Sequence, residues 1–174
     1  MNLWEGEILS RFTWKGNEFN VRTVCHPAQD MISAHIDSHL HTGIKFHFPY
    51  PTGIHTDNAC DWDANDKHST EVLKQDTQSA VLKRTLDSTV YYVELKWEGK
   101  ALLKEKEKNY FVLLPQEDAF SVSCAFTANE PDQLTVLPDF FEVESLAKNH
   151  WVNFWEEGAA VDFSHCTDPR AKEL

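Results

Sequence analysis

The 174-residue sequence has little positive charge, few glycines and no long apolar run. Lysine and arginine number 16 against 28 acidic residues, which gives a formal net charge of −12 at pH 7. Nucleic acids and anionic membranes both bind clustered lysine and arginine, so we expect neither as a partner. No apolar run approaches the roughly 20 residues of a transmembrane helix, and the first residues do not resemble a signal peptide. The compartment therefore stays open.

Several catalytic signatures are also missing. With 6 glycines, the chain has no glycine-rich phosphate loop, and neither a GxSxG nor an HExxH motif occurs. The cysteines are far apart and form no CxxC pair, so we expect unpaired thiols and no compact zinc site. They are Cys25, Cys60, Cys124 and Cys166.

Apolar and polar residues alternate with period 2 through most of the chain, which predicts strands. The first two strands, Ile8–Trp14 and Phe19–Cys25, flank a Lys-Gly-Asn turn and form a hairpin. Short turns with a similar composition separate the later runs, and the alternating charges of Lys104–Lys108 indicate a solvated turn. The pattern therefore predicts an all-β antiparallel β-sandwich. The later strands are expected at 31–37, 43–48, 71–74, 79–86, 90–97, 110–114 and 120–126.

The pattern changes near the C-terminus. From Phe140 to Glu157 the apolar residues recur at spacings of three and four, which predicts an amphipathic helix. Asp139 is the expected N-cap and Gly158 the expected C-cap. An extended stretch follows, and Pro169 then stands in the first turn of a new helix.

Several motifs together resemble the β-sandwich and linker of bacterial glycoside hydrolases related to family 65. The likeness begins with Trp4-Glu5-Gly6, Cys25-His26-Pro27 and Phe48-Pro49-Tyr50-Pro51. It continues through Asp61-Trp62-Asp63, His150-Trp151, Val161-Asp162-Phe163-Ser164 and Asp168-Pro169-Arg170, and so spans nearly the whole chain.

The resemblance implies a mutarotase-like supersandwich followed by a C-terminal linker helix. Residues 1–137 would form the later part of the sandwich, 138–158 the linker helix, and 159–174 an extended linker with the start of the first toroid helix. The catalytic carboxylates of such enzymes lie in a downstream (α/α)6 domain, so we expect none in this chain. Trp151 and Trp155 would then lie at the domain interface rather than line a sugar-binding cleft. The expected substrate is an oligosaccharide.

The segment from Phe48 to Thr70 is the first candidate for a ligand-facing surface. A loop of about twenty residues in a compact domain is usually functional or disordered, and this one is too rich in aromatic residues for disorder. Its candidate substrate-binding residues are Tyr50, His55, Asp57, Asp61, Trp62, Asp63 and His68.

Other interpretations of the same loop remain open. Its aspartates are typical of residues that cap turns, and Trp62 either offers a sugar platform or buries inward. His55, Cys60 and the aspartates include metal-binding atoms, but their spacing matches no zinc or EF-hand signature, so we expect no metal and no cofactor. The alternative to a β domain of a glycoside hydrolase is a self-contained carbohydrate-binding module, and a third is an interaction domain without a ligand.

Overall fold

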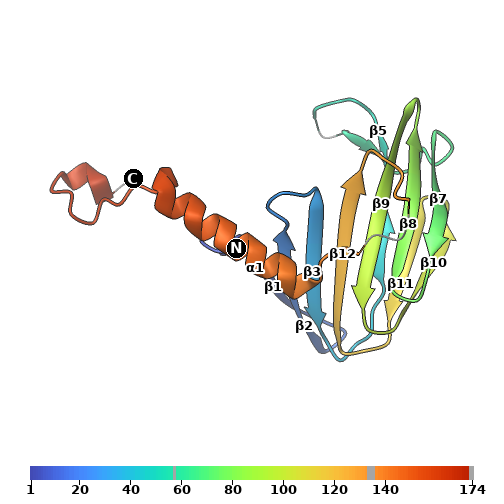
Figure 1. Cartoon of the computed structure of the whole chain (residues 1–174), viewed down its shortest axis with the longest axis horizontal. Helices are drawn as coiled ribbons and strands as arrows, with labels where there is room; N and C mark the ends of the chain where they lie inside the picture. The colour runs from blue at the N-terminus through green and yellow to red at the C-terminus, as the bar shows by residue number, and fades with distance from the viewer. Residues whose placement is uncertain (57, 133–135, 173–174) are drawn as a thin grey trace.

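The computed structural model describes residues 1–56, 58–132 and 136–172 (Figure 1). Antiparallel strands make up about half of it, and one long helix follows them. The strands are β1 Glu7–Trp14, β2 Asn17–Cys25, β3 Met31–Asp37, β4 Ile44–His47, β5 Tyr50–Pro51, β6 Cys60–Asp61, β7 His68–Gln75, β8 Ser79–Leu86, β9 Thr89–Glu98, β10 Ala101–Glu107, β11 Tyr110–Pro115 and β12 Ala119–Thr127. The helix is α1, Phe140–Phe154, which continues as a π-helical turn at Trp155–Ala159, and a short 3₁₀ helix spans Pro169–Lys172.

The strands form two stacked layers. The large sheet has seven strands in the order β1-β2-β3-β12-β9-β8-β7, and the small sheet has three in the order β10-β11-β4. Alternate residues of β8, β9 and β12 point toward the small sheet, where Leu82, Leu95, Trp97, Phe111 and Leu113 are almost fully buried. The chain is therefore an all-β sandwich followed by a helix, as the sequence predicts.

The predicted hairpin at the N-terminus is confirmed. β1 pairs with β2 in the register Trp14↔Asn17, and the two residues between them, Lys15 and Gly16, have φ of 50° and 77°. Positive φ at both central positions is the signature of a type I′ turn, whose twist suits a two-residue hairpin.

Helix α1 covers the opposite face of the large sheet. Its buried residues Phe140, Val143 and Ala147 pack on Val24 and Met31, which lie on β2 and β3. Asp139 caps the helix: its carboxylate accepts from the Glu142 N–H at 2.8 Å, while Glu142 accepts from the Asp139 N–H. The predicted N-cap is thus confirmed, and such a cap stabilises a helix by about 1 kcal/mol.

Two predicted boundaries were wrong. Lys104–Lys108 is not a turn, because Lys104 to Glu107 belong to β10, an edge strand whose charges face solvent. β7 begins at His68, three residues before the predicted start. The helical region itself agrees with the prediction: α1 ends at Phe154, but the π-helical turn carries the helix through Glu157, and Gly158 has the positive φ (109°) expected where a helix terminates.

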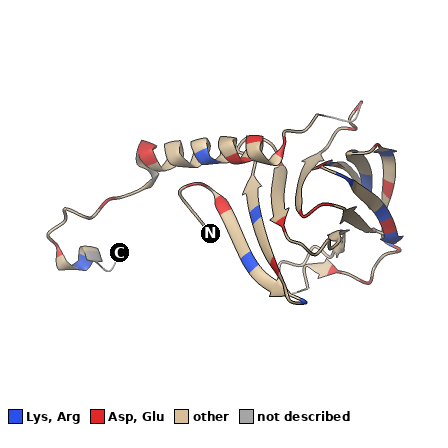
Figure 2. Cartoon of the chain, turned by 90° about the horizontal axis from the view of Figure 1, so that it is seen from below, with Lys and Arg blue, Asp and Glu red and all other residues tan. Residues whose placement is uncertain are grey.

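Acidic and basic residues are spread over strands, turns and α1 instead of gathering at one place (Figure 2). In the part of the chain that the structure describes, no helix combines the length and apolarity needed to cross a membrane.

Candidate functional site

The loop between β4 and β7 has structure of its own. Tyr50 and Pro51 pair with Asp61 and Cys60 as the two-stranded sheet β5–β6. Within the hairpin, the Thr52 hydroxyl donates to the Asn58 carbonyl at 2.6 Å. The loop projects from one end of the sandwich (Figure 1). The sequence therefore predicted an ordered loop correctly but not the short sheet inside it.

A buried polar network anchors this loop to the sandwich. Arg84 on β8 is 1% exposed, and its Nη1 donates to the Thr70 hydroxyl at 2.7 Å and to Asn109 Oδ1 at 3.2 Å. His68 Nδ1 lies 3.0 Å from the same Nη1. The Asn109 amide in turn donates to Asn65 Oδ1 at 3.3 Å. Three of these four contacts join the loop or its end to β8 or to the β10–β11 turn, and the Arg84–Asn109 contact joins those two elements.

The guanidinium of Arg84 is held by neutral groups. Besides the hydrogen bonds, the ring of Phe48 lies 4.8 Å from its central carbon, and the ring of Tyr91 lies 6.0 Å from it. A buried cation is costly unless it is hydrogen-bonded, and an aromatic face offsets part of that cost. Phe48, at the start of the loop, is therefore tied to Arg84 by electrostatics as well as by packing.

His68 is a buried member of this network. It is 4% exposed, and burial, followed by the positive charge of Arg84, lowers the pKa of its imidazole below the usual value. Because Nδ1 faces an N–H donor, it acts as the acceptor, and the ring is neutral. Of the six predicted site residues that the structure describes, His68 is the one that is buried.

Tyr50 contacts this network through the ring of His68. Its ring centroid is 5.9 Å from that of His68, and the Lys67 ammonium lies 5.3 Å from the Tyr50 ring. The Tyr50 hydroxyl donates to Asp87 at 3.0 Å, and this hydrogen bond raises the pKa of the phenol. The structure thus brings Tyr50 and His68 together and adds Lys67 and Asp87 to them.

The remaining predicted residues are spread along the loop surface. Trp62 is half-exposed, at 51%, and its ring lies 4.7 Å from that of His47 on β4. Asp61 accepts from the Asp63 N–H at 3.1 Å, which is the turn-capping role expected of loop aspartates. His55 and Asp63 are exposed, and Asp57 lies outside the described residues.

The loop surface presents side chains that can form hydrogen bonds with a polar ligand. Among the described residues, no group of three His, Cys, Asp or Glu is placed to hold a metal ion. The side chains that lie together are an aromatic ring, an ammonium and a carboxylate: Tyr50, Lys67 and Asp87. Together these groups offer hydrogen-bond donors and acceptors beside an aromatic face.

Sequence reasoning missed Arg84, Asn109, Lys67 and Asp87. The one local signal was Arg84, which stands at an inward position of β8 in the alternation Ala80, Leu82, Arg84. A charged residue in such a register indicates a buried polar contact. Its partners come from Thr70 and Asn109, which no local pattern connects to it.

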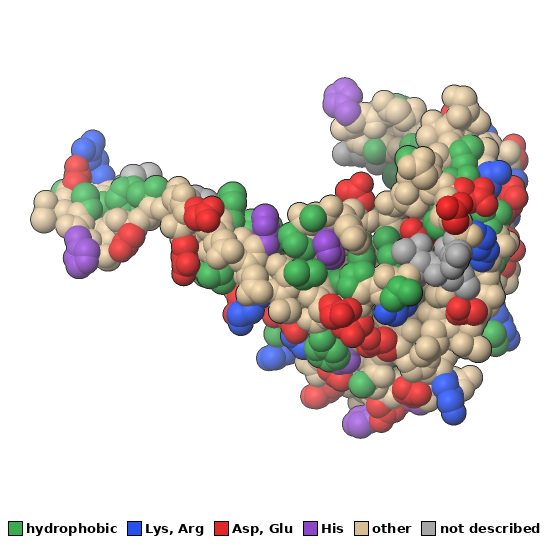
Figure 3. All heavy atoms as spheres, in the orientation of Figure 1, with side chains coloured by type: hydrophobic (Ala, Val, Ile, Leu, Met, Phe, Trp, Pro, Cys, Tyr) green, Lys and Arg blue, Asp and Glu red, His purple; other side chains and the backbone are tan. Residues whose placement is uncertain are grey.

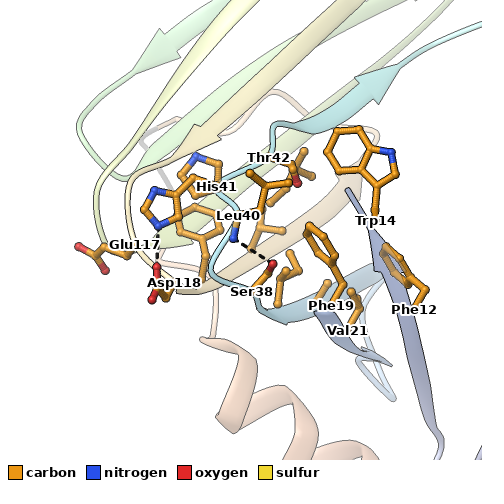
Figure 4. A pocket seen from close by; sticks show the side chains of 16 residues that line it. Phe12, Trp14, Phe19, Val21, Ser38, Leu40, His41, Thr42, Glu117 and Asp118 are labelled. Carbon is orange, nitrogen blue, oxygen red and sulfur yellow. Dashed lines mark hydrogen bonds and ion pairs between the residues drawn. The ribbon is translucent and has the colours of Figure 1, made fainter. Parts of the chain in front are cut away.

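A second concave surface lies on the inner face of the large sheet, beyond the edge of the small sheet. This inner-face groove encloses about 330 Å³ and is lined mainly by apolar side chains of β1, β2, β3 and β12 (Figure 4). Phe12 and Phe19 stack in it at 5.0 Å. At its rim His39 and His41 each lie 2.8 Å from Asp118, and their hydrogen bonds lower the pKa of that carboxyl group.

A third feature is the apolar end of α1. The helix extends past the sheet as an arm with hydrophobic side chains along it (Figure 3). Trp155 lies 6.1 Å from Trp151 and 5.8 Å from Trp4, and its indole N–H donates to the Leu3 carbonyl at 2.7 Å. Phe154 stays half-exposed, at 46%. Trp151 and Trp155 thus pack on the N-terminal turn, while Phe154 leaves one side of this aromatic group exposed to solvent.

Comparison with solved structures finds a similar fold. No protein-family profile and no curated protein matches the sequence. Among solved structures, the chain is similar to a protein described as a kojibiose phosphorylase from the human microbiome, with a TM-score of 0.60 and 12% identity. The similarity covers 89% of this chain but 24% of that chain. At this identity the likeness shows the fold alone.

Proposed function

We propose that the chain is the non-catalytic β-sandwich portion of a larger carbohydrate-active enzyme that acts on oligosaccharides. The main support for this proposal is the aromatic end of α1. Phe140, Val143 and Ala147 fix the first half of the helix to the sheet, whereas Phe154 lies beyond it and is half-exposed. An exposed aromatic cluster at the end of a helix is typical of a surface that packs on a further domain. The neighbour's larger size supports the same interpretation, since this chain corresponds to 24% of it.

Two roles follow for the domain. α1 would brace a downstream catalytic domain of the (α/α)6 type through Trp151 and Trp155. The Phe48–Thr70 loop, held by Arg84, would form one wall of the substrate cleft, with Tyr50, Trp62 and the loop carboxylates facing the sugar. The neighbour is described as a phosphorylase, so both phosphorolysis and hydrolysis are candidate reactions.

The coding sequence beyond codon 174 provides the first test. We expect the frame to continue, and the longer protein to cleave glucose disaccharides with or without inorganic phosphate, while residues 1–174 alone do not. Trp155→Ala should then lower the thermal stability of the longer protein, with Asn153→Ala on the same turn as the matched control. A stop codon directly after Leu174, or a folded 174-residue chain that cleaves disaccharides, would contradict the proposal.

The exposure of Trp62 favours one alternative, a self-contained carbohydrate-binding module. A half-exposed indole beside His47 is the kind of platform on which a sugar ring stacks. Calorimetric titration of residues 1–174 with gluco- and galacto-disaccharides separates the two functions. Saturable binding that Trp62→Ala abolishes supports the module, and a folded chain that binds none supports the wall-and-brace role.

A further inference from the structure

A further concave site lies at the end of the sandwich opposite the Phe48–Thr70 loop. The loop contacts the β8–β9 turn through Asp87, and the antiparallel strands place the turns β7–β8, β9–β10 and β11–β12 at the other end. The pocket between these three turns, here called the turn-end pocket, has a volume of about 720 Å³, which lies within the range of small-molecule sites. It opens between β7 and β10, which are the end strands of the two sheets on that side among the described residues (Figure 1).

The β7–β8 wall of the turn-end pocket is fixed by hydrogen bonds of its backbone. The Asp76 carboxylate accepts from the N–H groups of Gln78 and Ser79 at 2.7 and 2.6 Å. The indole N–H of Trp97, a buried residue of β9, donates to the Thr77 carbonyl at 3.1 Å. The turn is therefore held in one conformation and tied to β9.

The other two turns are joined to each other. Glu117 accepts from the Lys100 N–H at 3.2 Å, and the Gln116 N–H donates to the Lys100 carbonyl at 2.9 Å. Gly99 has a φ of +84°, and a Cβ at this position would collide with the Glu117 carboxylate, so that carboxylate packs directly on the glycine. The three turns therefore form a preformed frame, and a ligand that binds there does not have to order them.

Several polar side chains of the pocket face solvent without a partner. The amides of Gln78 and Gln116 and the Lys100 ammonium are exposed, and none of these side chains forms a hydrogen bond or ion pair with the described residues. An amide both donates and accepts, and an ammonium donates only. Ala101 and the 43%-exposed Leu102, at the start of β10, add an apolar surface beside them. A ligand that carries hydroxyl groups next to C–H groups matches such a lining.

We propose that the turn-end pocket binds a neutral sugar, as a carbohydrate site separate from the Phe48–Thr70 loop. The sugar hydroxyls bond to the amides of Gln78 and Gln116 and to the Lys100 ammonium, while C–H groups of the sugar ring lie on the apolar start of β10. The choice of a sugar among neutral polar ligands rests on the carbohydrate-linked function proposed above. The site adds to that function, since neither the loop wall nor the α1 brace uses this end of the sandwich.

The charges around the pocket favour a neutral sugar over an acidic one. Two carboxylates, those of Asp76 and Glu117, stand against the single ammonium of Lys100, in a chain whose net charge is −12. Acidic sugars and phosphate are therefore repelled. A peptide strand is also disfavoured, because the edge strand β10 carries alternating charges from Lys104 to Glu107, and such charges oppose the addition of a further strand.

The test is calorimetric titration of the 174-residue protein with maltose and with lactose. We expect weak, saturable binding of at least one of the two sugars. Gln78→Ala and Gln116→Ala should each raise the dissociation constant about 5-fold, as expected for one lost hydrogen bond. Gln29→Ala is the matched control, because it removes an exposed amide from the β2–β3 turn at the other end of the sandwich. It should leave the dissociation constant unchanged, and so should Trp62→Ala.

A second measurement locates the sugar without relying on a variant. In NMR spectra of the unchanged protein, the bound sugar should shift the backbone amide signals of residues 76–78, 99–102 and 116–117. A folded chain that binds neither sugar would overturn the proposal. Binding that Trp62→Ala abolishes and Gln116→Ala leaves unchanged would also overturn it, because that result places the sugar at the loop. Tighter binding of glucuronate or inorganic phosphate would do the same, because the ligand would then be an anion. The enzymatic role proposed above is tested by disaccharide cleavage in the longer protein, so either proposal can fail without the other.

Discussion

Arg84 and His68 face each other inside the sandwich, with guanidinium Nη1 3.0 Å from imidazole Nδ1. Both side chains are almost fully buried. The imidazole must stay neutral to accept this hydrogen bond, so the pair couples the fixation of the loop to pH.

The pKa of His68 is lowered in the folded chain, so acid should destabilise it. Between the unfolded value, about 6.5, and the lower folded value, the unfolded chain binds more protons, and stability falls as pH decreases through that window. Above about pH 6.5 the contribution is constant. Thermal melts from pH 8 to pH 5 should therefore show a falling Tm. His68→Gln should have a lower Tm at neutral pH and a shallower slope. An unchanged slope would mean that another group titrates.

Asn109 should be more sensitive to alanine than to glycine. It has φ of +62° and is fully buried, so its side chain serves the network while its backbone occupies the left-handed region. Both replacements leave Arg84 and Thr70 without the Oδ1 acceptor, a loss of about 1–3 kcal/mol. Alanine adds the left-handed strain, a further 1–2 kcal/mol or so. Urea denaturation should rank the variants wild type, Asn109→Gly, Asn109→Ala; equal stability of the two variants would refute the backbone argument.

The parts of the fold that depend on local patterns could be predicted from the sequence. Period-2 alternation located most strands, and Asp139 and Gly158 marked the ends of the helical region. β10 was not predicted, because an edge strand needs only one apolar residue, here Leu103, on its buried side. The alternating charges of the strand also resemble those of a solvated turn. Local patterning therefore fails for an edge strand that has one solvated face and one unpaired edge.

The site was predictable only in its surface part. The loop was located from its length and its aromatic residues, and these are properties of one segment. The network beneath it joins Arg84 to Thr70 and Asn109, which are 14 and 25 residues away along the chain. The inner-face groove joins residues as distant as Phe12 and Val122. Such contacts depend on sheet order, which periodicity does not specify.

The four cysteines should react in two classes. Burial raises the pKa of the Cys124 thiol to about 12, whereas Cys25, Cys60 and Cys166 are exposed. The thiolate is the reactive form, so Cys124 should stay unmodified at pH 8. An aromatic disulfide reagent should therefore titrate three thiols per native chain and four in denaturant. Cys124→Ala should leave the native count at three. A native count of four would show that the sandwich opens readily.

Gly6 and Trp151 should be coupled. Gly6 has φ of +66°, and a Cβ at this position would lie 2.0 Å from Trp151 Cδ1, so the indole fills the space above the glycine. Gly6→Ala should displace the ring and separate the N-terminal turn from α1, lowering stability by the backbone strain, about 1–2 kcal/mol, together with the lost packing. Trp151→Ala removes the clash but not the strain. In a double-mutant cycle Gly6→Ala should therefore be less destabilising in the Trp151→Ala background. Additive effects would mean that the two residues do not touch in solution. A positive coupling would identify the N-terminal turn as the support that holds the aromatic end of α1 in place for the domain it is proposed to brace.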